Sequence, residues 1–280
     1  MKKLFFRFDF SPKIKKFLTT LHNTQEQAIL WIIRQLLPFL FPRHCPLCGK
    51  LLPYGSFIHE ECHRELPLIH SPVCMRCGKP VSSHTQEYCY DCRAFPKSFQ
   101  RGLSLFLYKG LSLFLYNKKT RPIMSAFKYQ NRRGLADFFC QELCRYRLSQ
   151  LRDLGADAVI PVPIHKNKYK KRGYNQATLL SSRLALTLNL PHYPDMLIRS
   201  VDTLPQKQFN PQARLNNLKK AFCFNSHYDK LLSQSTPFSV LLVDDIYTSG
   251  ATMEACTRIL LEAGISEVYI LSICIGIARD

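Results

Sequence analysis

The stretch VLLVDDIYTSGAT, residues 240–252, runs from a strongly apolar segment straight into two adjacent carboxylates and a loop of small residues. Residues 239–243 are apolar enough for a strand that is covered on both faces, which is typical of a parallel sheet. Residues 251–263 repeat apolar side chains at helical spacing. A strand, a tight loop and a helix in this order predict an α/β domain.

Further segments of the chain fit the same fold. Residues 158–162 and 267–274 are short apolar runs that predict strands, and residues 176–188 carry the spacing of a helix. The chain has 280 residues, of which 46% are hydrophobic, so it can bury a substantial core. The predicted fold class is therefore α/β, with a parallel sheet flanked by helices.

The acidic pair and the loop that follows it predict a ligand site. Backbone N–H groups and the helix dipole at Thr248–Thr252 suit a phosphate, and Gly250 permits its close approach. Asp244 and Asp245 can accept hydrogen bonds from sugar hydroxyls or help to hold a divalent cation. A phosphorylated sugar matches both halves of the site. The stretch is neither a P-loop nor a dinucleotide-binding fingerprint.

The alternative is that Asp244 and Asp245 only cap the end of a strand in an ordinary turn. Two adjacent carboxylates at the end of a buried strand are costly to desolvate unless something binds them. Ligands of open α/β sheets also gather at this end of the strands. Both considerations favour the ligand site.

Seven of the twelve cysteines lie between residues 45 and 92. Six of them form three C-x-x-C pairs, and the seventh, Cys62, has the same spacing from His59. Two such pairs complete a tetrahedral zinc site, and a full set of protein ligands is typical of structural zinc. Redox activity of a C-x-x-C pair and iron–sulfur ligation are alternatives. The predicted ligands of two zinc ions are Cys45, Cys48, His59 and Cys62, and Cys74, Cys77, Cys89 and Cys92.

The pairing of these half-sites stays open at this point. Sequential pairing gives one site of three cysteines and a histidine and one of four cysteines, whereas interleaved pairing changes both. His44 or His63 could also take the place of His59. The remaining cysteines are expected to be core or near-core residues: Cys140, Cys144, Cys223, Cys256 and Cys274.

The chain carries 39 Lys and Arg residues against 20 Asp and Glu residues, a net charge of +19. Such a charge suits nucleic acid, phosphorylated ligands or an anionic membrane surface, although a solvated basic surface is the ordinary alternative. Five cations fall within seven residues and can neutralise a pyrophosphate or several nucleic-acid phosphates. They are Lys166, Lys168, Lys170, Lys171 and Arg172. Tyr169 lies among them and Tyr174 lies two residues after Arg172, and both rings could stack on bases of a single strand.

The N-terminal residues 1–44 predict a basic leader followed by an amphipathic helix. The start lacks a sustained apolar core and a cleavage site, and the apolar stretch 29–41 falls short of the ~20 residues that a membrane span needs. We therefore expect no membrane span and a cytoplasmic location. Residues 102–108 are repeated unchanged as 110–116, and an even offset puts the same side chains on the same face of a strand.

The ordered set of motifs resembles a known family. VLLVDDIYTSGAT resembles the 5-phosphoribosyl-1-pyrophosphate (PRPP) motif of type I phosphoribosyltransferases. Taken with the cysteine segment, Phe127-Lys-Tyr129, Pro161-Val-Pro-Ile-His165 and Arg172-Gly-Tyr-Asn-Gln176, it resembles the layout of the ComF family of competence-associated proteins over roughly residues 36–280.

This resemblance implies a double zinc ribbon at 45–98 and a type I phosphoribosyltransferase-like domain at 99–280. It implies PRPP as ligand, bound with Mg²⁺, and Asp244 and Asp245 as the catalytic acids that contact the ribose hydroxyls. Residues 197–222, with Arg199, Thr203, Gln206, Arg214 and Asn217, match the family's mobile segment. The implied PRPP-binding residues are Thr248, Ser249, Gly250, Ala251 and Thr252 for the 5′-phosphate, and Lys166 and Arg172 near the pyrophosphate.

The resemblance also implies a role. It points to DNA uptake during natural transformation, with single-stranded DNA and other competence proteins as partners. The alternatives are an active phosphoribosyltransferase, a pentosyl-group transferase acting on a base or an amine without a DNA role, and a PRPP-sensing scaffold.

Overall fold

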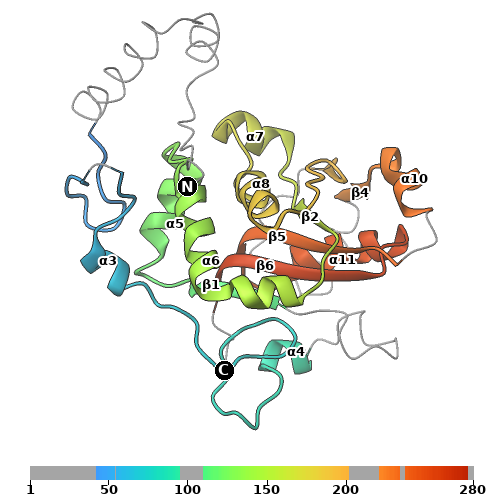
Figure 1. Cartoon of the computed structure of the whole chain (residues 1–280), viewed down its shortest axis with the longest axis horizontal. Helices are drawn as coiled ribbons and strands as arrows, with labels where there is room; N and C mark the ends of the chain where they lie inside the picture. The colour runs from blue at the N-terminus through green and yellow to red at the C-terminus, as the bar shows by residue number, and fades with distance from the viewer. Residues whose placement is uncertain (1–41, 54, 95–109, 202–220, 234–236, 277–280) are drawn as a thin grey trace, which may run out of the picture.

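A four-stranded parallel sheet forms the centre of the molecule (Figure 1). The computed structural model describes residues 42–53, 55–94, 110–201, 221–233 and 237–276. The strand order is β1-β6-β5-β2, and each neighbouring pair is parallel. The fold class predicted from the sequence is therefore confirmed. The strands are β1 (Gly110–Leu115), β2 (Ala158–Pro161), β5 (Ser239–Tyr247) and β6 (Glu267–Ile275).

Helices cover both faces of the sheet (Figure 1). Leu241 and Val243 of β5 pack into the core under α5, α6 and α8, whereas Val240 and Leu242 pack into the core under α11. This alternation is the period of two that a strand requires. The helices are α5 (Arg121–Tyr129), α6 (Leu135–Asp153), α8 (Gln176–Leu188) and α11 (Ala251–Glu262).

Shorter elements surround this centre. The antiparallel pair β3 (Leu197–Arg199) and β4 (Phe222–Phe224) contributes Leu197 and Phe222 to the core beneath α11. The basic run of the sequence forms a short helix, α7 (Lys166–Arg172), which His165 caps by accepting a hydrogen bond from the Asn167 N–H. The others are α3 (Glu60–Arg64), α4 (Tyr90–Ala94), the 3₁₀ turn η2 (Ser226–Tyr228) and α10 (Asp229–Leu232).

The segment between the two cysteine clusters covers the β1 edge of the sheet. Leu68 pairs with Phe114 in antiparallel register, and the Ile69 N–H donates to the Leu113 carbonyl at 3.1 Å. Cys45 and Leu66, before this crossing, belong to the core under α6, whereas Ile69 and the second cluster belong to the core on the α11 side. Packing is thus continuous across the predicted boundary at residues 98–99.

Glu142 of α6 joins the first cysteine cluster to the sheet domain. It is buried, and its carboxylate contacts His63 Nε2 at 2.5 Å and Arg145 Nη1 at 3.4 Å. Glu142→Ala is expected to lower the free energy of unfolding by about 2 to 4 kcal/mol, because it leaves His63, whose side chain is only 14% exposed, without its carboxylate partner. Urea unfolding measures this difference. Glu142→Gln, which keeps the shape, should cost less, and equal losses for the two variants would contradict the role of the charge.

Some expectations change and others lie outside the described residues. Cys140, Cys256 and Cys274 are buried and Cys144 is partly buried, but Cys223 is exposed, which corrects its prediction as a core or near-core residue. It is the middle residue of β4, where strand alternation turns its side chain to solvent. The second copy of the repeat forms β1, whereas the first copy, the leader and its helix, and Thr203, Gln206, Arg214 and Asn217 fall outside the described residues. No described helix is long and apolar enough to cross a membrane.

Candidate functional site

The acidic pair lies where β5 continues beyond its neighbour β2. The two strands pair through Pro161 and Val243, and the Val162 N–H then donates to the Val243 carbonyl at 2.8 Å. β5 continues to Tyr247 because its pairing with β6 continues to Ile275. The strand expected to end at residue 243 is therefore longer, and Asp244 and Asp245 are part of it. Strand β2 ends at Pro161, opposite Val243, so it does not extend alongside the two acids.

Asp245 is buried and paired with a lysine from another element. Its Oδ1 lies 3.0 Å from Nζ of Lys128, the penultimate residue of α5, and only 8% of Asp245 is exposed. Burial opposes the charged form of Lys128, but the charge of Asp245 and the hydrogen bond to it raise the lysine pKa above its ordinary value. The Lys128 ammonium therefore lies where a cation offsets the charge of Asp245.

Asp244 binds the backbone N–H of the residue that follows it within β5. Its Oδ1 accepts a hydrogen bond from the Asp245 N–H at 2.8 Å. Burial and the charge of Asp245 raise the pKa of Asp244 to about 7, although this hydrogen bond and the charges of Lys128 and Arg199 oppose the shift. The charge of Asp244 also contributes to raising the pKa of Cys256 in α11, after burial. The Asp244 side chain therefore lies on the α11 side of the sheet, whereas the Asp245 side chain contacts α5.

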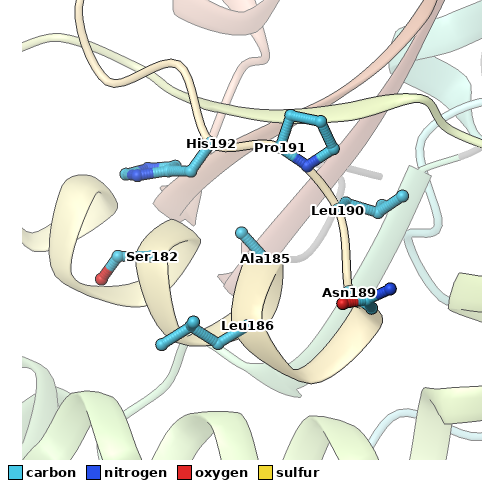
Figure 2. A pocket seen from close by; sticks show the side chains of 7 residues that line it. All are labelled: Ser182, Ala185, Leu186, Asn189, Leu190, Pro191 and His192. Atoms are coloured by element: carbon cyan, nitrogen blue, oxygen red, sulfur yellow. The ribbon is translucent and has the colours of Figure 1, made fainter.

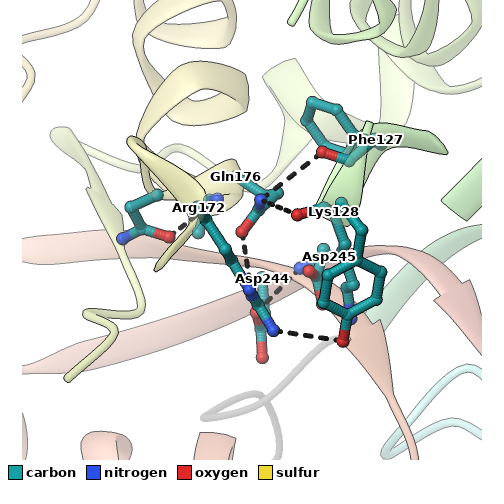
Figure 3. Close-up of polar contacts among 9 residues, drawn as sticks. Phe127, Lys128, Arg172, Gln176, Asp244 and Asp245 are labelled. Atoms are coloured by element: carbon teal, nitrogen blue, oxygen red, sulfur yellow. Dashed lines mark hydrogen bonds and ion pairs between the residues drawn. The ribbon is translucent and has the colours of Figure 1, made fainter. Parts of the chain in front are cut away.

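A polar network connects the acidic pair to the end of α7 (Figure 3). Arg172, the last residue of α7, donates to Gln176 Oε1 at 3.1 Å. The Gln176 amide donates to the carbonyls of Phe127 and Lys128 at 3.4 and 3.5 Å. Arg172 also contacts the Tyr129 hydroxyl at 3.4 Å. The path from α7 to Asp245 therefore runs through Gln176 and Lys128.

Aromatic packing fixes the α5 end of this network. The ring of Phe127 is fully buried and lies 5.4 Å from that of Phe139 and 6.4 Å from that of Tyr174. The Tyr174 hydroxyl donates to the Phe127 carbonyl. Tyr174 is only 4% exposed, so the expectation that it stacks on a base is wrong. Tyr174 is instead a core residue that anchors the end of α5, where Lys128 lies.

The loop after β5 leads directly into the first turn of α11. Gly250 has φ +73°, a left-handed conformation that favours glycine, and α11 begins at the next residue. The Glu254 N–H donates to the Gly250 carbonyl at 2.8 Å, and the N–H groups before it lie in the first turn, where a helix supplies no partner of its own. Thr248 and Ser249 are exposed, and Ala251 and Thr252 are partly exposed. Backbone donors and hydroxyls thus stand at one helix start beside Asp244.

Lys166 and Arg172 occupy different positions relative to this loop. Arg172 belongs to the network of the acidic pair, but Lys166 is exposed at the start of α7. Among the described residues, no hydrogen bond or ion pair joins Lys166 to either acid. The Val162–His165 loop before it is tied down by Asn175, whose side chain donates to the Val162 carbonyl at 2.9 Å.

The cysteine segment forms two groups of four ligands in sequential order. Within each group the ligand atoms lie within 4.8 Å of one another, and Sγ of Cys77 and Cys89 are 3.6 Å apart. Tetrahedral thiolates around one zinc ion lie about 3.8 Å apart, so one ion fits each group. In an iron–sulfur cluster the four cysteine ligands are divided among two or more irons, so the set of four is spread more widely than around a single ion. The groups are Cys45, Cys48, His59 and Cys62, and Cys74, Cys77, Cys89 and Cys92.

His59 is oriented as a metal-binding histidine requires. Its Nε2 donates to the Leu51 carbonyl at 2.7 Å, which leaves Nδ1 without a proton and 3.2 Å from Sγ of Cys48. His44 and His63 lie outside both groups, and His63 contacts Glu142 instead. The alternative histidine ligands are therefore not favoured by the geometry.

The second group is more enclosed than the first. All four of its cysteines are buried, whereas Cys48 is exposed and His59 and Cys62 are partly exposed. Hydrogen bonds from Cys77, Cys89 and Cys92 lower the pKa of the Cys74 thiol. Buried Lys79 contacts Asp91 at 2.5 Å and ties the two knuckles together.

A hollow of about 510 Å³ lies elsewhere, at the end of α8 (Figure 2). Its lining includes Leu186, Leu190 and His192. His192 pairs with Val159 of β2, at the edge of the sheet. Its Nε2 forms a hydrogen bond of 2.8 Å with the Ser181 hydroxyl. The acidic pair, in contrast, lies beyond the end of β2. The hollow and the acidic pair are thus separate features.

The sequence did not assign a role to three residues of the network. Lys128, Tyr129 and Gln176 lie within segments that carry the family resemblance, but nothing in their local pattern predicts contact with Asp245 or Arg172. A lysine between two aromatic residues at the end of an amphipathic helix was the available signal. Only the tertiary fold brings it to a carboxylate 117 positions further along the chain.

Comparison with known proteins gives matches over most of the chain. Residues 36–93 match the double zinc ribbon domain. Competence protein F of Haemophilus influenzae is 27% identical, with 84% of this chain and 95% of that protein covered. Competence protein ComFC of Bacillus subtilis is 26% identical over 76% of this chain and 82% of its own. DNA utilization protein YhgH of Escherichia coli (strain K12) is 25% identical over 83% and 97%.

One similar solved structure is glutamine phosphoribosylpyrophosphate (PRPP) amidotransferase from B. subtilis, complexed with ADP and GMP. It is 19% identical, with a TM-score of 0.31. The comparison covers 51% of this chain and 26% of that one, so the chain spans about a quarter of the amidotransferase.

Proposed function

Because the chain is homologous to ComF-family proteins over most of its length, we propose that it is a PRPP-binding, phosphoribosyltransferase-like protein that acts in DNA uptake and handles single-stranded DNA. The names of its relatives, which refer to competence and to DNA utilization, support the DNA role. The net charge of +19 is compatible with a nucleic-acid ligand.

The observation that carries the PRPP proposal is the acidic pair at the end of β5, followed within five residues by Gly250 and the start of α11. In this proposal Asp244 and Asp245 accept hydrogen bonds from the two ribose hydroxyls. The N–H groups and hydroxyls of Thr248–Thr252 hold the 5′-phosphate at the helix start. Arg172 and Lys166 hold the pyrophosphate, and Mg²⁺ offsets its charge.

Lys128 has a role that the family resemblance did not supply. In the structure its ammonium lies 3.0 Å from Asp245. A ribose hydroxyl would then bind a carboxylate that Lys128 already holds in place, which lowers the entropy cost of ordering the Asp245 side chain on binding. Lys128 thus positions Asp245 rather than replacing the metal.

The two ligand groups of residues 45–92 are proposed to hold two structural zinc ions. The donor sets, the short separations and the His59 orientation fit zinc, and no open coordination position is left for catalysis. Because each group shares a core with one side of the sheet, bound metal would stiffen the sheet domain itself. We propose that residues 1–44, 45–98 and 99–280 are three sequence modules. The described parts of the second and third modules pack against each other.

Two binding measurements test this proposal. Isothermal titration with PRPP and Mg²⁺ should give one site per chain. Anisotropy of a labelled oligothymidine should report binding at low salt that weakens as salt rises. Four phosphates neutralised near α7 would give a slope of log K against log salt of about −3. The absence of heat with PRPP would overturn the donor site, and unmeasurable DNA binding at low salt would overturn the DNA role.

The alternative is an active transferase, in which a base or amine forms a bond to the anomeric carbon as the bond to pyrophosphate breaks. The hollow at the end of α8 lies at the edge of β2 rather than beside the acids, so it is not placed to hold such an acceptor. Pyrophosphate release from PRPP, measured with a panel of bases and amines, decides between them. Release that depends on one acceptor and is lost in Asp244→Asn would establish transfer.

A further inference from the structure

An exposed aromatic ring lies directly beside the acidic pair. Tyr129 ends α5, one residue after Lys128, and is 63% exposed. The Arg172 guanidinium lies over its ring at 5.1 Å from the centroid and donates to its hydroxyl at 3.4 Å. At this exposure much of the ring stays open to solvent. A planar ring with an adjacent guanidinium is the kind of platform on which an unpaired base stacks.

Exposed cations continue from this platform along α7. Lys166, Lys170 and Lys171 are exposed, and Tyr169 between them is 54% exposed. Few acids compensate them, since the helix Lys166–Arg172 contains none. Cations that neutralise phosphates, alternating with exposed rings that stack on bases, are the two requirements of single-strand binding. We call Tyr129, Tyr169, Arg172 and these three lysines the α5–α7 surface.

Arg172 belongs both to this surface and to the network of the acidic pair. Through Gln176 it reaches the backbone of Lys128, which pairs with Asp245. The charge of Arg172 is also close enough to lower the pKa of Lys128 in part, against the larger effect of Asp245. A ligand that binds Arg172 on the α5–α7 surface therefore competes with a ligand that binds Arg172 beside the acidic pair.

We propose that the α5–α7 surface binds an unpaired stretch of DNA, that Tyr129 is its stacking platform nearest the acidic pair, and that PRPP and DNA bind antagonistically because both need Arg172. This inference rests on the proposed function and deepens it. Two polyanions that share one guanidinium and the field of the same lysines repel each other. By linkage, DNA must weaken PRPP binding by the same factor by which PRPP weakens DNA binding.

The test is oligothymidine anisotropy with and without PRPP and Mg²⁺, at constant ionic strength, together with the reverse titration by calorimetry. Saturating PRPP is expected to raise the apparent Kd for DNA at least fivefold, and saturating DNA to raise that for PRPP equally. Sulfate at matched ionic strength should leave DNA affinity unchanged. DNA affinity that is unchanged or higher when PRPP occupies its own site would overturn the antagonism.

Variants separate stacking from charge. Tyr129→Ala should weaken DNA binding by about 5- to 100-fold, the worth of one stacked base. Tyr129→Phe, which keeps the ring, should stay near wild type. Tyr146→Ala is the matched control, because Tyr146 is 38% exposed on α6 and outside this surface. Equal effects of Tyr129→Ala and Tyr146→Ala would overturn the platform.

Arg172→Lys tests the shared residue, since it keeps the charge but loses the planar group that covers Tyr129. It should weaken each ligand alone and reduce their mutual antagonism to less than half of the wild-type factor. Antagonism that survives unchanged in this variant would assign it to the lysines instead and overturn the role of Arg172. A wild-type protein that binds neither ligand alone would instead refute the proposed function, so the two failures are distinguishable.

Discussion

Cys74→Ser is expected to remove one of two bound zinc equivalents and to lower the free energy of unfolding by roughly 5 kcal/mol or more, because the binding energy of a structural zinc is folding energy. Cys74 is buried with its three partner thiols and shares a core with strands β5 and β6. Loss of the metal would leave a loop-rich segment without enough apolar contacts to stay folded. Metal analysis and thermal unfolding measure the two effects together.

Two other cysteines serve as comparisons for Cys74. Cys48→Ser should cost less, since Cys48 is exposed and its group is more open. Cys223→Ser is the matched control, because Cys223 is an exposed cysteine outside both groups. Two zinc equivalents and a wild-type unfolding temperature in Cys74→Ser would refute a structural metal in the second group.

Asp244→Asn and Asp245→Asn are expected to abolish or greatly weaken PRPP binding while changing stability in opposite directions. Each removes a charged acceptor for a ribose hydroxyl, which should cost about 10- to 150-fold in affinity. Asp245→Asn also removes the negative partner of the largely buried Lys128 ammonium, and it should destabilise the protein by about 1 to 3 kcal/mol. Asp244→Asn removes a carboxylate that the fold disfavours when it is ionised, and should stabilise the protein.

The pH dependence gives the Asp244 prediction its sign. The folded protein holds a proton on Asp244 up to about pH 7, far above the ordinary carboxyl pKa of 3.8. The folded state therefore binds more protons than the unfolded state between those values, and stability falls as pH rises through that window. The advantage of Asp244→Asn should be absent near pH 4, grow toward pH 7 and stay constant above it, at about 1 to 3 kcal/mol.

Guanidinium unfolding at pH 4.5, 6 and 8, paired with calorimetry of PRPP binding, checks both variants. Equal stability of wild type and Asp244→Asn at pH 8 would show that Asp244 is not strained by its surroundings. PRPP affinity retained in both variants would place the ribose elsewhere.

Much of the fold was predictable because its signals are local. Apolar runs predicted β2, β5 and β6, and helical spacing predicted α8 at its observed bounds. The end of β5 was not predictable, because two carboxylates argue for a turn. The paired backbone of β6 carries the strand past them to Tyr247. Long-range pairing thus overrode a local polarity signal.

The site divides in the same way. The metal groups follow from pairs two residues apart, and the sequential order of the observed groups reflects short connections between them. The Lys128–Asp245 pair joins α5 to β5, and no local pattern reports such a contact. Tyr174 was misjudged because its neighbours are basic, while its own ring faces Phe127 in the core. Charge patterns describe a surface, and they do not say which rings among them are buried.

Residues 67–69 lie along β1, so the connection between the two metal groups also occupies backbone donors and acceptors that an edge strand would otherwise offer. If the metal groups unravel, that cover loses its anchors at both ends. An uncovered, apolar edge strand is a template for pairing with another chain. Metal-depleted protein is therefore prone to aggregate by edge-to-edge pairing, so zinc would protect the solubility of the chain as well as its shape.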